Sequence, residues 1–259
     1  MNHDFFWIDA FTDRPFAGNP AGVVPLERWL PDGLMQQIAA ENGLSETAFF
    51  VPLGPGRYHL RWFTPATEID LCGHATLATA FVLLRHLGAE GTLRFETRSG
   101  EVCVHPRGDL LELDFPSRPP TPCDPPAGLS EALGAAPREV LCARDLLCLF
   151  DDAEAVIALR PDIAALGRLP HHAVIVSAPG QDCDFVSRFF APRQGVPEDP
   201  VTGSAHCTLV PYWAGHLGRD SLHARQVSAR GGELWCTLRG ERVGIAGRAV
   251  AYLRGMIQV

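Results

Sequence analysis

The residues best suited to chemistry in this chain surround two glycines, one in each half. His74 follows Gly73, while Asp199 and Ser204 flank Gly203. Each glycine opens an apolar stretch that predicts a helix, and the first turn of a helix leaves backbone N–H groups unpaired at the positive end of its dipole. Such a helix start holds anions readily. The pattern predicts that these glycines bind a small carboxylate; the alternative is that they only permit tight strand-to-helix turns.

The two glycine segments belong to a longer repeat. Residues 61–65 (RWFTP) recur as residues 188–192 (RFFAP), at an offset of 127 positions, and Gly203 follows Gly73 by 130 positions. Both offsets are close to half of the 259-residue chain. A repeat of this kind indicates an internal duplication. We expect two pseudo-symmetric halves whose helix starts face a shared cleft.

Two further polar residues stand out in the first half. Glu46 opens a predicted strand whose other members are mostly apolar, and a carboxyl group in apolar surroundings suits proton transfer at neutral pH. A solvated strand end is the alternative for Glu46. Asn19 lies in a Gly/Pro-rich loop, where its side chain either faces the cleft or caps its own turn.

Composition restricts the class of partner. The net charge of −8 and the pI near 5.6 argue against nucleic acid and anionic membrane surfaces, which need a basic face. No segment resembles a signal peptide, and the longest apolar run is about half of what spans a bilayer. We therefore expect a cytoplasmic protein without nucleic-acid or membrane partners.

The chain contains no lysine, since all 22 of its basic side chains are arginine. Schiff-base chemistry and the anchoring of pyridoxal phosphate both need a lysine amine. The eight cysteines include no Cys-x-x-Cys pair, so neither a zinc ribbon nor a disulfide framework is indicated. We expect no metal, no cofactor, and a chemistry that depends on side chains alone.

The predicted elements give an α+β protein. Each half has one long apolar helix among mostly antiparallel strands, with the sheet curled around the helix. A proline-dense linker covers residues 116–128, and its prolines predict that it continues neither sheet nor helix. The predicted halves are residues 1–116, with Glu46 and the Gly73 helix start, and residues 117–248, with the Gly203 helix start; a strand at 249–259 is expected to return to the first half.

Four ordered motifs resemble one family over essentially the whole chain. They are residues 9–22 (DAFTDRPFAGNPAG), 45–47 (SET), 70–76 (DLCGHAT) and 198–205 (EDPVTGSA). Together they are similar to the PhzF, or phenazine-biosynthesis-like, family. The resemblance implies the diaminopimelate-epimerase-like fold, a homodimer, and cofactor-free isomerase activity on a small cyclic, amino-acid-like carboxylate.

The resemblance also implies roles for individual residues. Glu46 would be the general acid/base that moves a proton between carbons of the substrate, while His74, Asp199 and Ser204 would bind and polarise the substrate. The amides of Gly73 and Gly203 would hold its carboxylate. Further candidate substrate-binding residues are Asn19, Ser45 and Thr202.

Two alternatives remain open from the sequence. One is a one-base racemase or epimerase of an amino-acid-like carboxylate, and the other is a non-catalytic binding protein with the same fold. The epimerase relatives place a cysteine at each helix start. Here Cys72 fills the first position but Thr202 the second, which argues against a two-cysteine racemase and predicts that Cys72 is a packed thiol.

Overall fold

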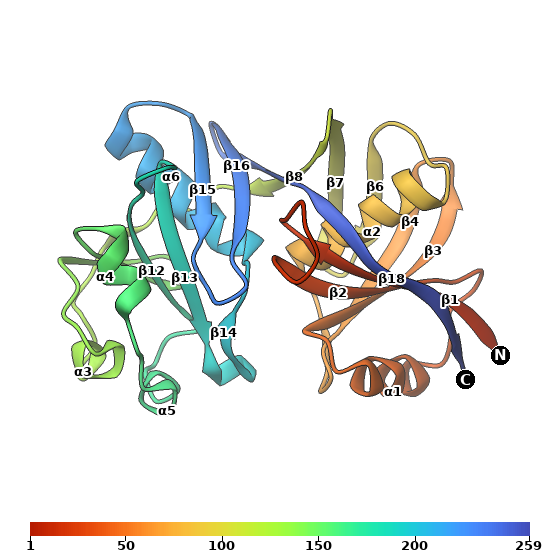
Figure 1. Cartoon of the computed structure of the whole chain (residues 1–259), viewed down its shortest axis with the longest axis horizontal. Coiled ribbons are helices and arrows are strands. Elements are labelled where there is room, and N and C mark those ends of the chain that lie inside the picture. The colour runs from red at the N-terminus through yellow and green to blue at the C-terminus, as the bar shows by residue number, and fades with distance from the viewer. The chain divides into compact units, whose positions relative to one another are not determined.

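The computed structural model describes residues 1–259, which divide into two compact units (Figure 1). Unit 1 comprises Met1–Asp114 and Ala246–Val259, and unit 2 comprises Phe115–Ile245. The C-terminal segment belongs to unit 1 because its strand pairs with the N-terminal strand along nearly its whole length. Both units combine many strands with few helices, which confirms the predicted α+β class.

Unit 1 is a mixed sheet with two helices. Its elements are β1 (Asn2–Ala10), β2 (Asn19–Pro25), α1 (Asp32–Asn42), β3 (Glu46–Gly54), β4 (Arg57–Phe63), β5 (Glu68–Ile69), α2 (Gly73–His86), β6 (Leu93–Thr97), β7 (Gly100–Arg107), β8 (Leu110–Pro116) and β18 (Ala249–Gln258). β1 pairs antiparallel with both β18 and β2. From β2 onward the pairs alternate: β2–β3 and β4–β6 are parallel, while β3–β4 and β6–β7 are antiparallel.

Helix α2 forms the centre of unit 1. Every residue from His74 to Ala80 is buried, as are Val82 and Leu83, and the helix contacts β1, β2, β3 and β18. A helix that is apolar on nearly all sides is stable only when it is surrounded. The sheet therefore curls around α2, as the sequence predicts. Helix α1 ends before Gly43, whose φ of 60° gives a left-handed stop.

Unit 2 contains the remaining elements. They are β9 (Thr121–Pro122), α3 (Leu129–Leu133), β10 (Glu139–Cys142), β11 (Leu146–Leu149), α4 (Ala153–Ala158), α5 (Ile163–Leu166), β12 (Val174–Pro179), β13 (Phe185–Ala191), η1 (Pro192–Gln194), β14 (Val196–Asp199), η2 (Gly203–Ala205), α6 (His206–Leu217), β15 (Ser221–Gln226), β16 (Gly232–Arg239) and β17 (Arg242–Gly247). Strands β11–β12 and β13–β15 pair parallel, and strands β12–β13 and β15–β16 pair antiparallel. This is the same alternation as from β2 to β7 in unit 1, so the duplication seen in the sequence is also present in the topology.

The second central helix starts differently from the prediction. Gly203–Ala205 form a 3₁₀ turn, and the α-helix proper begins at His206. Pro211 lies inside this helix and cannot donate to the carbonyl of Cys207 four residues earlier. The backbone N–H of Arg118 donates to that carbonyl instead, at 2.8 Å. A backbone N–H of the linker therefore replaces the helical hydrogen bond that Pro211 cannot make.

Two expectations about the linker region are wrong. The proline-dense segment is predicted to hold no sheet, but β9 lies within it and pairs with β10 further along the chain. The short helix α3 begins directly after the segment. The cysteines were not expected to pair, but Cys123 and Cys142 form a disulfide between these two strands. Their 19-residue separation matches no short cysteine motif, so the pairing depends on the β9–β10 contact. No helix is long and apolar enough to cross a membrane.

Candidate active site

Asn19 is placed by a strained loop between β1 and β2. Phe11 adopts a φ of 63°, which is unfavourable for a bulky residue, and its buried ring lies where a Cβ on Gly247 would be only 2.3 Å away. Gly18 also has a positive φ, and a Cβ there would meet the Ala10 carbonyl at 2.2 Å. The two glycines thus allow the tight loop, which ends by placing Asn19 fully buried at the start of β2.

Glu46 is placed by the parallel pairing of β3 with β2. The register puts Glu46 opposite Ala21, two residues beyond Asn19 on the same strand. Only 9% of Glu46 is exposed, and the following residues of β3 are buried. Ser45 immediately precedes the strand and is half-buried. The alternative of a solvated strand end is therefore not what the structure shows for Glu46.

His74 joins these residues from the first turn of α2. Its Nε2 lies 2.9 Å from Glu46 Oε2, and its Nδ1 lies 3.2 Å from Asn19 Nδ2. The contact with Glu46 is short but poorly aligned, so Glu46 Oε2 accepts no well-formed hydrogen bond from the chain. A buried carboxyl oxygen whose one close contact is poorly aligned is incompletely satisfied, and such arrangements are typical of functional sites.

The surroundings of His74 determine its charge. Burial by itself lowers the pKa of His74, whereas the Cys72 sulfur and the Glu46 carboxylate raise it, and the net direction is well above the ordinary value. The raised pKa favours the protonated form of the His74 ring beside the Glu46 carboxyl group. Asn19 can hydrogen-bond to His74 in either protonation state. Its carboxamide N–H donates to an unprotonated Nδ1, and its carbonyl oxygen accepts from a protonated Nδ1.

Cys72 precedes Gly73 and is also buried. Its Sγ lies 3.5 Å from His74 Nδ1. Burial, followed by the nearby Glu46 carboxylate, raises the pKa of Cys72, so that the thiol stays neutral at neutral pH. A neutral thiol is a poor nucleophile and a poor base. The geometry supports the prediction of a packed cysteine.

Glu46, Cys72 and His74 are also the group in the chain that could hold a metal ion. One ligand atom from each lies within 4.8 Å of the others. Three such ligands would suit zinc with one open position. A metal would have to displace the 2.9 Å contact between His74 and Glu46, however, and the absence of a metal stays a prediction.

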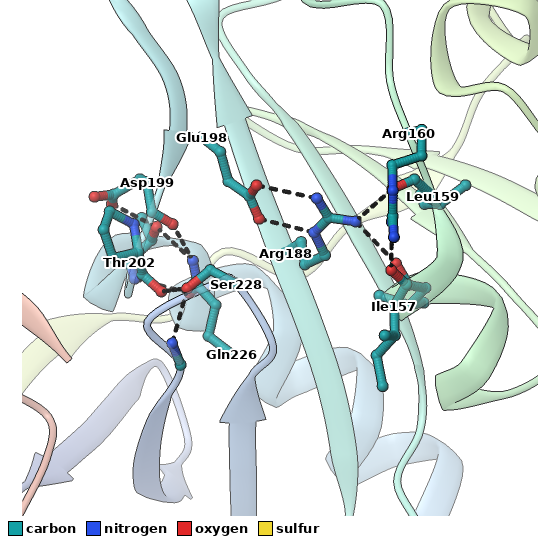
Figure 2. A network of polar contacts seen from close by, with 12 residues as sticks. Ile157, Leu159, Arg160, Arg188, Glu198, Asp199, Thr202, Gln226 and Ser228 are labelled. Carbon is teal, nitrogen blue, oxygen red and sulfur yellow. Dashed lines mark hydrogen bonds and ion pairs between the residues drawn. The ribbon is translucent and has the colours of Figure 1, made fainter. Parts of the chain in front are cut away.

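The second set of predicted residues lies in unit 2, just before helix α6; Figure 2 shows two of them, Asp199 and Thr202. Asp199 ends β14 and is half-buried, and the Thr202 hydroxyl donates to its Oδ2 at 2.5 Å. Gly203 is buried and Ser204 is half-buried in the 3₁₀ turn that follows. The structure thus brings Asp199, Thr202, Gly203 and Ser204 together within unit 2, as it brings Asn19, Ser45, Glu46, Gly73 and His74 together within unit 1.

Matching contacts brace the two helix starts. In unit 1, Arg61 makes a two-pronged ion pair with Glu68, at 2.7 and 2.8 Å, and its guanidinium lies over the Phe63 ring. In unit 2, Arg188 makes the same ion pair with Glu198, at 2.7 and 3.0 Å, and lies over the ring of Phe190. Each pair ties a central strand to the short strand that leads into the glycine.

Two more contacts recur beside the glycines. Ser99 Oγ donates to the Asp70 carbonyl at 2.8 Å, and Ser228 Oγ donates to the Pro200 carbonyl at the same distance. The carbonyl before each glycine is capped from the helix, by Thr76 Oγ1 at 2.6 Å in unit 1 and by His206 Nδ1 at 2.9 Å in unit 2. The duplication therefore extends to the hydrogen bonds that shape both helix starts.

Two buried residues of this site escaped the sequence argument, Gln226 and His206. Gln226 binds both Thr202 and Asp199 from the end of β15. In the sequence, only the repeat itself could have pointed to these two residues. An alignment extended past the helices would have matched Ser228 with Ser99, and would have shown a glutamine where unit 1 has Thr97.

The family model of phenazine biosynthesis-like proteins, PhzC-PhzF, matches residues 8–255. An uncharacterized isomerase of Pseudomonas aeruginosa is 55% identical over 260 residues, which cover all of both chains. The chain belongs to the PhzC-PhzF family. A human phenazine biosynthesis-like domain-containing protein is 39% identical over 99% of both chains.

Solved structures agree with membership of the PhzC-PhzF family. The crystal structure of a PhzF-family protein from Enterococcus faecalis matches with a TM-score of 0.98 and 46% identity over all of both chains. A hydroxyproline epimerase from Agrobacterium vitis matches with a TM-score of 0.65 at 13% identity, over 99% of this chain and 92% of that one, and shows the shared fold alone. Like its close relatives in the PhzC-PhzF family, this protein is an isomerase.

Proposed function

We propose that this protein is a cofactor-independent isomerase that moves a proton within a small cyclic or amino-acid-like carboxylate, with Glu46 as general acid/base. The observation that carries the proposal is the buried carboxylate of Glu46, whose Oε2 lies 2.9 Å from the His74 ring and accepts no aligned hydrogen bond. Such an oxygen can take a proton from one substrate carbon and return it to another. The net reaction is an isomerisation that needs no oxidant or reductant.

The neighbours of Glu46 support each half of this proton transfer. His74 Nε2, 2.9 Å from Glu46 Oε2, is placed to orient the carboxyl group that accepts and returns the proton. The largely buried position of Glu46 keeps most water away from the transferred proton. The proposed roles of Gly73 and Gly203 in holding the carboxylate, and of Asp199, Ser204, Thr202, Asn19 and Ser45 in binding and polarising the substrate, come from the resemblance to the family.

The structure does not favour a two-cysteine racemase. Cys72 is a neutral, buried thiol, and the equivalent position holds Thr202, whose hydroxyl is engaged with Asp199. A one-base racemase would use the same Glu46 and differs only in returning the proton to the carbon that lost it. A non-catalytic binding protein would not need the Glu46 carboxylate at all. The experiment below distinguishes the proposed isomerase from the one-base racemase and from the binding protein.

Deuterium uptake in D₂O, followed by mass spectrometry and product analysis, tests the proposal. The panel contains dihydro-hydroxyanthranilate together with cyclic and amino-acid carboxylates. We expect Glu46→Gln to reduce uptake at least about 100-fold, since general acid/base catalysis contributes about 10² to 10⁴ in rate. A rearranged product indicates an isomerase, and inversion at a stereogenic carbon indicates a racemase.

The matched control is Glu96→Gln, which makes the same charge change at an exposed site on β6. Thermal unfolding of both variants separates loss of chemistry from loss of fold. Uptake that persists unchanged in the Glu46 variant would contradict the proposal. Our further proposals are a cytoplasmic homodimer without nucleic-acid or membrane partners; sedimentation of the purified protein tests the dimer.

A further inference from the structure

Gln226 is the residue by which the two helix starts differ most. It ends β15 and is 1% exposed. The equivalent position in unit 1 holds Thr97, whose hydroxyl donates to Gly100 within its own turn at 2.7 Å and not to the helix start. The surrounding contacts are otherwise repeated, including the Ser99 and Ser228 hydrogen bonds. The Gln226 side chain is thus a specific addition to the half that carries Asp199.

The backbone determines which way the Gln226 carboxamide points. The Thr202 N–H can only donate, and it meets Oε1 at 2.8 Å; the Asp199 carbonyl can only accept, and it meets Nε2 at 2.6 Å (Figure 2). Both contacts fail if the amide is turned over. Gln226 therefore ties both ends of the loop from residue 199 to residue 202.

This orientation in turn directs the Thr202 hydroxyl. The Gln226 Nε2 also lies 3.2 Å from Thr202 Oγ1, where it donates, so the hydroxyl hydrogen is directed at Asp199 Oδ2, 2.5 Å away. Asp199 Oδ2 accepts this hydrogen. The chain of hydrogen bonds therefore runs from Gln226 through Thr202 to the Asp199 carboxyl group.

We propose that Gln226 is a positioning residue for Asp199, acting through Thr202 and the Asp199 carbonyl to hold the Asp199 carboxyl group as an acceptor in a fixed position. The inference rests on the proposed function for its effect on catalysis, because Asp199 is a substrate-binding residue there. Its structural part is independent of any substrate. Both parts are tested with Gln226→Met, which keeps the length of the side chain and removes its polar atoms.

The first measurement needs no substrate. Amide hydrogen exchange of Thr202 reports the hydrogen bond to Gln226 Oε1. We expect exchange at Thr202 to become about tenfold faster in Gln226→Met, the change expected for one hydrogen bond, while exchange at Val227, whose N–H donates to the Ser187 carbonyl, stays unchanged. Unchanged exchange at Thr202 would overturn the inference whether or not any substrate is turned over.

The second measurement is a double-mutant cycle on deuterium uptake. If Gln226 acts through Asp199, Gln226→Met lowers kcat/KM about 10-fold or more in the wild-type background and by less than about 2-fold in the Asp199→Asn background. Equal losses in both backgrounds would show a merely structural role and overturn the inference. Gln36→Met is the matched control, since Gln36 also donates to a backbone carbonyl, that of Thr64 in unit 1, at 2.8 Å.

The hydrogen-exchange measurement and the double-mutant cycle distinguish a failure of this inference from a failure of the proposed function. A wild-type protein that acts on no member of the panel would count against the proposed function, and the exchange arm would still decide whether Gln226 holds the loop. Normal exchange at Thr202 together with a large loss of uptake in Gln226→Met would place the effect of Gln226 elsewhere, which also overturns the inference.

Discussion

Two buried histidines at the helix starts have pKa values that are shifted in opposite directions. The pKa of His74 is raised well above its ordinary value because the Cys72 sulfur and the Glu46 carboxylate outweigh burial. Burial lowers the pKa of His206 to about 4, and its hydrogen bond to the Thr202 carbonyl offsets only part of this change. The same residue type is thus favoured in its protonated form beside the proposed catalytic carboxyl group, and is a neutral cap in the other repeat.

The neutral state of His206 predicts a pH-dependent stability. The unfolded chain binds a proton at this position below about pH 6.5, whereas the folded chain binds one only near pH 4. The stabilisation from neutral His206 is therefore complete above pH 6.5 and is lost as the pH falls toward 4, by about 3 kcal/mol. His206→Gln keeps a hydrogen-bond donor but does not titrate, so its free energy of unfolding should lack this acid-side loss.

Urea unfolding of the wild type and His206→Gln between pH 7 and pH 4 measures this difference. His223→Gln is a suitable control, because His223 is partly exposed on β15. Parallel pH dependence in the wild type and the His206 variant would contradict a buried neutral imidazole.

At the scale of elements, the two arginine–glutamate pairs hold equivalent strands but differ in their other partners. Arg188 also donates to the carbonyls of Val156 and Leu159, at 3.1 and 3.0 Å, and so ties α4 to β13 (Figure 2). Arg61 instead has the exposed carboxylate of Asp32 as its third partner. Solvent can replace Arg61 at Asp32, but it cannot readily reach the two carbonyls around Arg188.

We therefore expect Arg188→Met to destabilise the protein more than Arg61→Met. Removing one partner of a buried ion pair costs about 3–5 kcal/mol, and the Arg188 variant also leaves two carbonyls without a donor. Because Arg61 has a well-exposed third partner, its replacement should cost about 1–2 kcal/mol less. The free energies of unfolding of the two variants, measured side by side, test this order. Equal losses would show that the carbonyl contacts of Arg188 contribute little.

At the scale of the whole molecule, the disulfide joins the first strand of unit 2, β9, to its neighbour β10. Cys123 and Cys142 join β9 to β10 within unit 2. A disulfide that closes a loop of about this length contributes roughly 3 kcal/mol, mainly by restricting the unfolded chain. Disulfides are uncommon in the cytoplasm. The redox state of this pair therefore bears on the proposed localisation.

The expected result is that a reductant lowers the free energy of unfolding of the wild type by about 3 kcal/mol and leaves that of the Cys123→Ser, Cys142→Ser double variant unchanged. Denaturant titrations with and without dithiothreitol measure both, and mass spectrometry of the alkylated protein counts the free thiols. Cys103→Ser keeps the pair intact and serves as the control. A wild-type stability that is indifferent to the reductant would contradict a stabilising disulfide.

The sequence by itself determined the duplication and the fold class, and it named most of the residues that the structure gathers at the two helix starts. Local patterns carry this information, since Gly73 and Gly203 open apolar helices and Glu46 begins a β-strand. Only the tertiary structure decided how these residues are supported. Gln226 lies 24 positions from Thr202, and Cys142 lies 19 from Cys123, so their contacts follow from strand pairing and not from any short motif. The charge of His74 depends on burial and on neighbours from three different elements, which a linear pattern does not contain.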